Sequence, residues 1–278
     1  MPIIRVFPTK TNMTPTDNYA FCGYPPFPQF IPEHDEVHIS VTFTWDIQKG
    51  YKLQKAWKAV TNKPVKIGGV AFGDPGNSFS PGMYLKKGIV ITSRGCPNNC
   101  WFCFVPKREG DIRELSITEG HIIQDNNFLA CSRSHRLKVY EMLKAQSDIK
   151  FLGGLEAKRL TDWDIEQMRG LKIHELWLAC DTRAVLPKVI DTINRLKSRG
   201  FKQNQIRCYV LIGFDMREEH DRLIELLKAG CLPFAQLYQP EQKREYDYKW
   251  KQFQRMWCRP AIYKSLGGYF EKIRERIS

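Results

Sequence analysis

Cys96, Cys100 and Cys103 lie within the run SRGCPNNCWFC at residues 93–103. Thiolates at this C-x3-C-x2-C spacing can converge on one soft metal centre, and cysteine is the usual protein ligand of iron–sulfur clusters. Three ligands are one fewer than a closed four-cysteine site requires, so one coordination position stays open. The spacing therefore predicts a metal centre that does chemistry on a bound ligand.

A structural zinc site is the competing interpretation of the same cysteines. Zinc ribbons usually carry two C-x2-C pairs, and no second pair is present here. The remaining cysteines stand alone in the sequence, at positions 22, 131, 180, 208, 231 and 258. Because zinc would need a distant fourth ligand, we favour an iron–sulfur cluster.

The run is similar to the cluster-binding motif of the radical S-adenosylmethionine (radical SAM) superfamily. This resemblance implies that Cys96, Cys100 and Cys103 hold three irons of a [4Fe-4S] cluster, and that the fourth iron binds S-adenosylmethionine (SAM). It further implies reductive cleavage of SAM to a 5′-deoxyadenosyl radical that removes hydrogen from a substrate. Phe102 takes the aromatic position that lies near the adenine in this family.

Residues 104–110 also resemble the methylthiotransferase branch of the superfamily. Those enzymes carry a second cluster on an N-terminal domain with three cysteines, whereas Cys22 is the only cysteine before the motif here. A methylthiotransferase-like modification enzyme is therefore an alternative that we disfavour. A second alternative is a non-catalytic nucleic-acid-binding protein with a structural metal site.

Strand and helix patterns alternate from residue 88 onward, which predicts an α/β fold with a parallel sheet. The resemblance covers residues 88–240 and implies the partial (β/α)6 TIM-like barrel of the radical SAM core. Residues 104–131 are interpreted as an insertion in it. The predicted strands are 88–92, 149–152, 175–179, 207–212 and 233–238, and the predicted helices are 133–146, 161–169, 184–199 and 217–229.

Residues 1–87 are predicted to form a small N-terminal extension. Proline-rich residues 1–35 favour surface wrapping and neither a helix nor a central strand. A strand at 37–45, a helix capped by Asp46 and a strand at 64–67 give one β-α-β unit. This unit resembles half of a cobalamin-binding domain, but the histidine motif of that domain is incomplete, so no cobalamin is expected.

Chemistry in α/β barrels gathers at the carboxyl ends of the strands. Gly153, Gly154 and Glu156 follow a predicted strand and resemble the Gly-Gly-Glu motif that contacts the SAM amino group, with Leu155 inserted. The alternative is an ordinary strand-to-helix turn. Asp181 follows the next strand, where it would bind the SAM ribose or cap the helix at 184–199.

Two further predictions concern adenine and catalysis. The strand containing Val210 and Ile212 loosely resembles the family strand whose backbone meets the adenine. Cys131 is the candidate catalytic residue, because a thiol near a radical can donate hydrogen or form a covalent intermediate. The alternative for Cys131 is a small buried apolar side chain.

The net charge of +13 is concentrated toward the two ends of the chain. Residues 241–278 carry 10 basic and 5 acidic side chains, and they are predicted to form two helices with a basic outer face. Such flanks attract polyanions, which makes a nucleic acid the expected partner, with a merely basic surface as the alternative. An electron donor such as flavodoxin or ferredoxin is expected from the resemblance.

The location of the protein is predicted from its apolar segments and its cysteines. No run approaches the roughly 18 apolar residues of a membrane span, and the N-terminus lacks an apolar signal core. Nine cysteines without a secretion signal indicate a reducing interior. We therefore expect a cytoplasmic protein without a membrane partner.

Overall fold

The computed structural model describes residues 2–73 and 83–265. The chain divides into two compact units. The first comprises residues 1–118 with 241–243, and the second comprises residues 119–240 with 244–278. Both units are α/β structures built on parallel strands.

A four-stranded parallel sheet organises the first unit, with the strand order β2-β1-β3-β4. The prediction that residues 1–35 form no central strand is wrong, because β1 pairs with β2 on one side and β3 on the other. The alternation that buries Ile4 and Val6 outweighs the nearby prolines. The strands are β1 (Ile3–Phe7), β2 (Ala20–Cys22), β3 (Glu36–Ser40) and β4 (Val65–Gly68).

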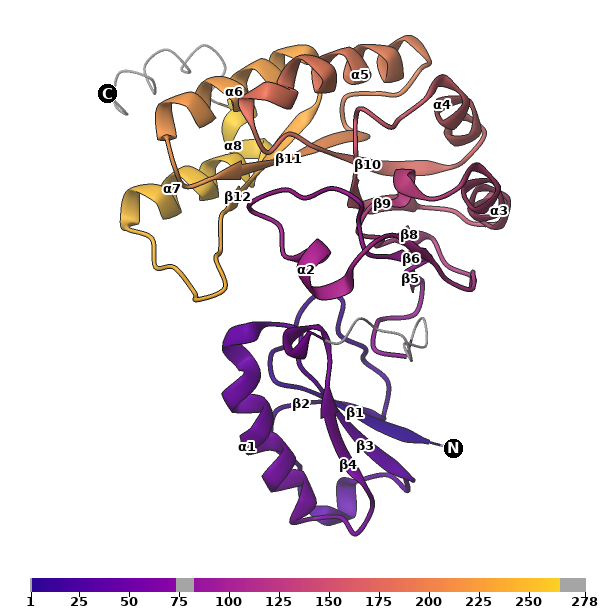
Figure 1. Ribbon diagram of the computed structural model, residues 1–278, viewed down its shortest axis with the longest axis vertical. Coiled ribbons are helices and arrows are strands. Elements are labelled where there is room, and N and C mark those ends of the chain that lie inside the picture. The colour runs from indigo at the N-terminus through magenta and orange to yellow at the C-terminus, as the bar shows by residue number, and fades with distance from the viewer. Residues whose placement is uncertain (1, 74–82, 266–278) are drawn as a thin grey trace. The chain divides into compact units, whose positions relative to one another are not determined.

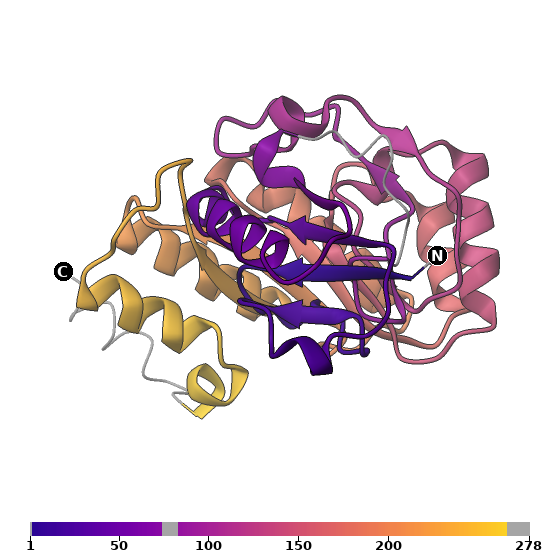
Figure 2. The ribbon, with the colours of Figure 1, turned by 90° about the horizontal axis from the view of Figure 1, so that it is seen from below.

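Helix α1 (Ile47–Lys58) packs against this sheet through the buried side chains of Leu53 and Trp57 (Figures 1 and 2). Asp46 occupies the N-cap position as predicted, but its side chain makes no capping hydrogen bond. The predicted strand at 37–45 ends early, and Thr44–Asp46 forms the short helix η2 instead. A single helix therefore covers the core-facing side of the sheet.

The cysteine run of the first unit lies between short elements. Strands β6 (Ser93–Arg94) and β7 (Arg113–Glu114) pair antiparallel on either side of it. The remaining elements of this unit are η1 (Pro28–Phe30), η3 (Val70–Phe72), β5 (Ile89–Val90) and α2 (Val105–Glu109).

The second unit alternates parallel strands with helices, and its strands β8 to β12 lie side by side in chain order (Figure 1). The described strands form no closed barrel. The strands are β8 (Ile122–Ile123), β9 (Ile149–Leu155), β10 (Ile173–Ala179), β11 (Ile206–Ile212) and β12 (Leu232–Leu237). The helices that follow them are η4 (Phe128–Ala130) with α3 (Arg133–Lys144), α4 (Asp162–Arg169), η5 (Arg183–Val185) with α5 (Leu186–Ser198), α6 (Met216–Ala229), α7 (Tyr248–Trp257) and α8 (Pro260–Ser265).

Strand β8 lies within residues 104–131, so this predicted insertion contributes a strand to the sheet. Its two residues, Ile122 and Ile123, pair with Lys150 and Phe151 of β9. A two-residue strand is too short to produce an alternating sequence pattern, which explains why the sequence did not predict it. The polar residues 125–127 consequently follow a strand of the sheet.

No helix in the described ranges combines the length and apolar character that crossing a membrane requires.

Candidate functional site

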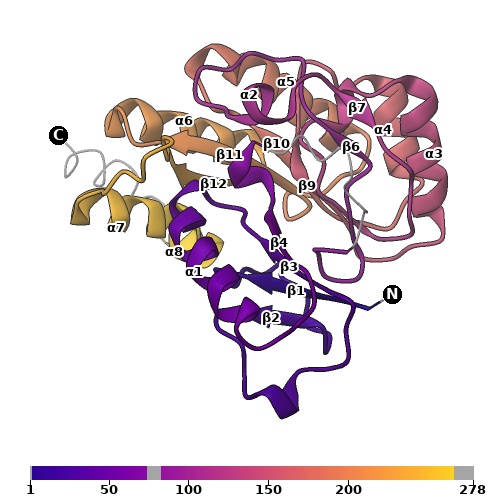
Figure 3. The same cartoon turned by 60° about the horizontal axis from the view of Figure 1, so that its bottom comes forward.

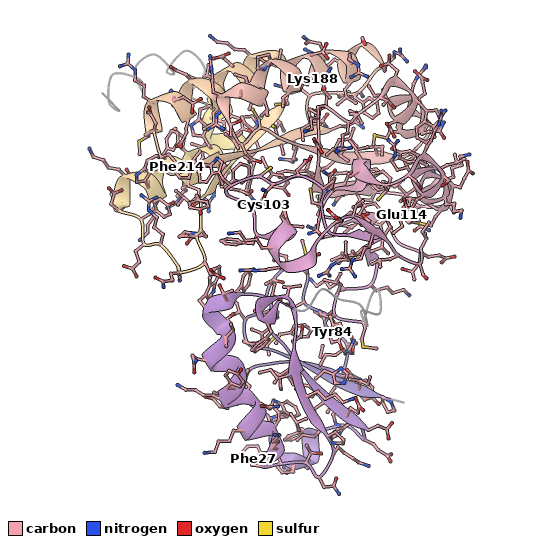
Figure 4. All side chains as sticks on the ribbon, in the orientation of Figure 1. Phe27, Tyr84, Cys103, Glu114, Lys188 and Phe214 are labelled. Atoms are coloured by element: carbon pink, nitrogen blue, oxygen red, sulfur yellow. The ribbon has the colours of Figure 1, made fainter. Side chains whose placement is uncertain are left out.

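The three motif cysteines of the first unit lie in irregular backbone between β6 and α2, and all three are half-buried. The Cys96 N–H donates to the Gly110 carbonyl across 3.0 Å, and the Cys103 N–H donates to the Cys100 carbonyl across 3.0 Å. Figure 4 marks Cys103 just before α2. Irregular backbone of this kind leaves thiol groups free of helical or strand periodicity, so nearby cysteines can turn toward one ligand.

The ends of this loop are held by a glycine and a buried ion pair. Gly95 has φ +84°, and a Cβ there would lie 2.1 Å from the Asp111 carbonyl oxygen. Arg94 Nε and Glu109 Oε2 are 2.7 Å apart, with side chains only 7% and 9% exposed. The loop therefore has fixed ends, and Glu109 also accepts a hydrogen bond from the Gly95 N–H.

The donor chemistry of the loop fits an iron–sulfur cluster, because three thiols are soft ligands. Among the described residues, no group of three or more His, Cys, Asp or Glu side chains is already arranged around a metal position. Phe102 lies between two of the cysteines and packs edge-on against the exposed Trp101, with ring centroids 5.4 Å apart. The loop thus supplies the ligands, and convergence of the thiols would accompany metal binding.

Polar side chains meet where β8 and β9 end in the second unit. Asn127 Nδ2 donates to Glu156 Oε2 across 2.8 Å, and Asn127 itself is only 4% exposed. Arg159 Nε also donates to Glu156 Oε2, at 2.8 Å, and Lys158 Nζ lies 3.0 Å from Glu156 Oε1. Glu156 is therefore an oriented carboxylate paired with two cations. Asp125 lies on the same β8–α3 connection as Asn127 and is 2% exposed.

Glycine is required at positions 153 and 154 for two different physical reasons. A Cβ on Gly153 would lie 1.8 Å from the Asp125 carbonyl oxygen, so this glycine permits close approach of the β8–α3 connection. Gly154 has φ +87°, and the nearest atom to a Cβ there is Tyr209 Cδ2 at 4.0 Å. A Cβ on Gly154 would therefore make an ordinary contact without a clash. A hollow is lined here by Ile123, Asp125, Phe128, Phe151, Gly153, Gly154 and Leu155.

Asp181 follows β10 and does not cap the helix after it. The N-cap residues of η5 and α5 are Thr182 and Val185, and neither uses a side-chain cap. Burial raises the pKa of Asp181 from 3.8 to about 6, while the charge of Arg222 opposes the increase. The capping alternative is thus wrong for this residue, and a carboxylate with a shifted pKa is left at the end of β10.

Arg222 and Glu219 of α6 organise the same edge, and the sequence analysis missed both. Arg222 is 2% exposed and donates to the carbonyl oxygens of Cys180, at 2.8 Å, and Leu211, at 3.0 Å. The carboxylate of Glu219 accepts hydrogen bonds from the backbone N–H groups of Gly213, Phe214 and Asp215 across 3.0–3.3 Å. Phe214, labelled in Figure 4, lies in the loop whose N–H groups bind Glu219, and it is 49% exposed. A charged residue in an amphipathic helix pattern usually faces solvent, so neither had a sequence signal.

Val210 and Ile212 are buried completely in β11. Their side chains pack in the core, so contacts to a ligand would have to come from the backbone. The Ile212 carbonyl already accepts a hydrogen bond from the Tyr238 N–H across 2.9 Å. A carbonyl oxygen has a second lone pair, so a further donor can still bind it.

Cys131 ends η4, between β8 and α3, and is 5% exposed. It follows the Asn127 segment that contacts Glu156, so it belongs to the same connection as the polar cluster. Its burial agrees with a small apolar side chain, and its catalytic role stays a prediction.

No family model matches this chain, and a search of curated proteins gives no similar sequence.

Proposed function

We propose that this protein is a radical SAM enzyme that holds a [4Fe-4S] cluster through Cys96, Cys100 and Cys103. When bound, the cluster and SAM would supply the chemistry, in which one electron from a donor such as flavodoxin or ferredoxin breaks a carbon–sulfur bond of SAM to give methionine and a 5′-deoxyadenosyl radical. The single observation that carries the proposal is the loop geometry, in which three half-buried thiols lie in one irregular segment clamped at both ends.

The second unit would supply the contacts to SAM. Glu156 would accept hydrogen bonds from the SAM amino group, because its carboxylate is already oriented by hydrogen bonds from Asn127 and Arg159. Asp181 would accept from the ribose hydroxyls at the end of β10. Backbone groups at Val210 and Ile212 would meet the adenine, with Phe102 contributing an aromatic surface.

The strand order of the second unit supports a partial (β/α)6 barrel as its finer fold. Parallel strands that follow one another in chain order, each joined by a helix, show the winding of (β/α) barrels. In such folds the functional side chains come from the carboxyl ends of several strands. Glu156 and Asp181 occupy such positions after β9 and β10.

We further propose that the substrate is a nucleic-acid base and that the enzyme works in the cytoplasm, where reducing conditions keep the thiols available. Cys131 would act on the substrate, as a hydrogen donor or a covalent attachment point. The chain's own contribution is to bind and orient the reactants and to exclude water.

The test is an anaerobic assay of the full chain after reconstitution with iron and sulfide. SAM and dithionite are added and 5′-deoxyadenosine is quantified, with tRNA or DNA fragments included in parallel samples. We expect wild type and Cys22→Ala to form 5′-deoxyadenosine, and Cys96→Ala, Cys100→Ala and Cys103→Ala to form none. Cys22 is an exposed cysteine outside the motif and so serves as the matched control.

Two results would contradict the proposal. Zinc in the purified protein with no cluster after reconstitution would favour a structural metal site in a nucleic-acid-binding protein. A stable cluster that never cleaves SAM, even with nucleic acid present, would leave no basis for the enzyme assignment.

A further inference from the structure

The C-terminal helix α7 presents a face of cationic and neutral side chains to solvent. Between Tyr248 and Ser265 the sequence contains no Asp or Glu, and its basic residues are Lys249, Lys251, Arg255, Arg259 and Lys264. We define the α7 basic face as Tyr248, Lys251, Gln252, Arg255 and Arg259, all of which are exposed. The four of these residues that belong to α7 lie on the side opposite its buried Phe253 and Trp257, and Arg259 follows just after the helix.

The opposite side of α7 anchors the helix to the rest of the unit. Phe253 is 4% exposed and Trp257 is fully buried. Their rings lie 6.0 and 5.7 Å from the ring of His220 on α6. The Cys258 thiol, just after the helix, donates to the Ala235 carbonyl of β12 across 3.1 Å. Helix α7 lies next to β12 (Figure 3). The α7 basic face therefore has a fixed orientation within the second unit.

The cations of this face differ from other cations of the unit in that they form no ion pair in the part of the chain that the structure describes. Arg195 pairs with Asp162, and Arg207 pairs with Glu175. Within the described residues, Lys251, Arg255 and Arg259 form no ion pair. Their charges are consequently available to an anionic partner.

The spacing of these three cations suits an extended polyanion. Lys251 and Arg255 are four residues apart in α7, which places them on one side of the helix about 6 Å apart along its axis. Arg259 follows just after the helix ends at Trp257 and adds a third cation. Like charges at this spacing repel and destabilise a helix. A chain of phosphates along the row would neutralise all three charges and remove that repulsion.

An aromatic ring stands at the start of the same row. Tyr248 is 73% exposed, and its hydroxyl accepts a hydrogen bond from Gln252 Nε2 at 2.7 Å. Exposed aromatic rings next to cations are the usual platform for stacking bases of single-stranded nucleic acid. Bases in a duplex are already stacked on one another, so this ring favours an unpaired strand.

We infer that the α7 basic face is a binding site for single-stranded nucleic acid. Phosphates bind Lys251, Arg255 and Arg259, and one base stacks on Tyr248. This inference rests on the proposed function in that it names the substrate class and the surface that recruits it. Binding itself requires neither cluster nor SAM, so it can succeed or fail independently of SAM cleavage.

The experiment measures binding of the full chain to short fluorescent RNA and DNA oligonucleotides by anisotropy, over a salt series from about 50 to 200 mM. The triple variant K251Q/R255Q/R259Q removes the row. Each phosphate contact to a single strand contributes about 0.7 to the log–log salt slope, so the slope should fall by about 2 and affinity near 0.1 M salt should fall about 100-fold. Comparing RNA with DNA shows which backbone the site prefers.

The matched control K138Q/K172Q/K202Q removes three exposed lysines elsewhere in the second unit. It should keep the wild-type slope and affinity. Tyr248→Ala should weaken binding about tenfold without changing the slope, because stacking releases no counterions. Tyr248→Phe should bind like wild type.

Equal losses in the two triple variants would overturn the inference, since binding would then follow net charge alone. So would binding to vesicles of phosphatidylcholine and phosphatidylserine with no binding to oligonucleotides, which would identify an anionic membrane as the partner. Circular dichroism of each variant confirms that loss of binding is not loss of fold.

Discussion

Asn127 Nδ2 donates a hydrogen bond to Glu156 Oε2 across 2.8 Å and so joins the connections that follow β8 and β9. Both side chains are largely buried, with Asn127 4% exposed and the Glu156 side chain 16% exposed. A carboxylate oriented in this way is already ordered, which lowers the entropic cost of binding a ligand to it.

Replacing Glu156 tests its assignment to the SAM amino group. A hydrogen bond that involves a charged group contributes about 1.5–3 kcal/mol, so Glu156→Gln should weaken SAM binding about 10- to 100-fold. Equilibrium dialysis of labelled SAM against the reconstituted protein measures this. Glu141→Gln, an exposed residue of α3 paired with Lys144, is the control and should bind SAM normally. Unchanged affinity in Glu156→Gln would remove this residue from the site.

The two site glycines should respond differently to alanine. In Gly153→Ala the new Cβ would lie 1.8 Å from the Asp125 carbonyl oxygen, so the free energy of unfolding should fall by about 3 kcal/mol, the upper end of the usual overpacking cost. Gly154→Ala has space, so only its left-handed backbone should cost about 1–2 kcal/mol. Urea denaturation of both variants measures the difference. Equal stability would indicate that the β8–α3 connection moves away readily.

The buried ion pair at the ends of the cysteine loop should control both stability and metal loading. Glu109→Gln leaves the Arg94 charge buried without its carboxylate partner, which typically costs about 3–5 kcal/mol. We expect lower stability in urea and less iron per chain after reconstitution. The double variant Arg94→Met with Glu109→Leu should recover part of the stability, because no charge is then buried. Full iron loading in Glu109→Gln would show that the Arg94–Glu109 ion pair is not needed to position the cysteines.

Asp181 should make stability fall as pH rises. Its folded pKa of about 6 exceeds its ordinary 3.8, so its folded form holds a proton more tightly than its unfolded form. Its stabilising contribution is therefore complete below about pH 4 and is lost as pH rises through 6. Asp181→Asn should gain about 1–3 kcal/mol relative to wild type between pH 4 and pH 7.5.

Urea denaturation at the two pH values measures this gain, and Asp191→Asn on the exposed side of α5 is the control. Glu219 titrates in wild type and in both variants and so cancels from the comparison. A gain that does not depend on pH would mean that the Asp181 carboxylate is solvated in the folded state.

Cys131 offers a test that separates chemistry from packing. If the thiol acts on the substrate, Cys131→Ala should still form 5′-deoxyadenosine but should yield no modified product from a nucleic-acid substrate. A buried thiol replaced by alanine also leaves a small cavity, so a loss of about 1 kcal/mol in stability is expected. Mass spectrometry of the nucleic acid measures the product. Normal product formation in the variant would leave Cys131 with a packing role only.

Local patterns in the sequence predicted most helices and strands of the second unit. Its apolar periodicities correspond to β9 to β12 and α3 to α6, because each element has its own repeat of buried positions. The C-x3-C-x2-C run was equally visible, since its ligands are neighbours in the chain. Two helices were expected in residues 241–278, and α7 and α8 lie in the part of that segment that the structure describes, whereas residues 266–278 lie outside the described residues.

Interactions between distant segments were decided only by the tertiary structure. The central position of β1 depends on partners 15 or more residues away, and the two-residue strand β8 pairs with β9, which lies 28 residues further along the chain. Gly153 looked like a ligand-facing glycine, yet its missing Cβ makes room for Asp125. In the sequence Arg222 and Glu219 resemble surface charges. In the structure both are buried, Arg222 donating to the Cys180 carbonyl and Glu219 accepting from the Gly213 N–H. The sequence alone determined which residue types are available and which segments are regular. Folding decided what each side chain meets, because burial and hydrogen bonding depend on partners that no local pattern encodes.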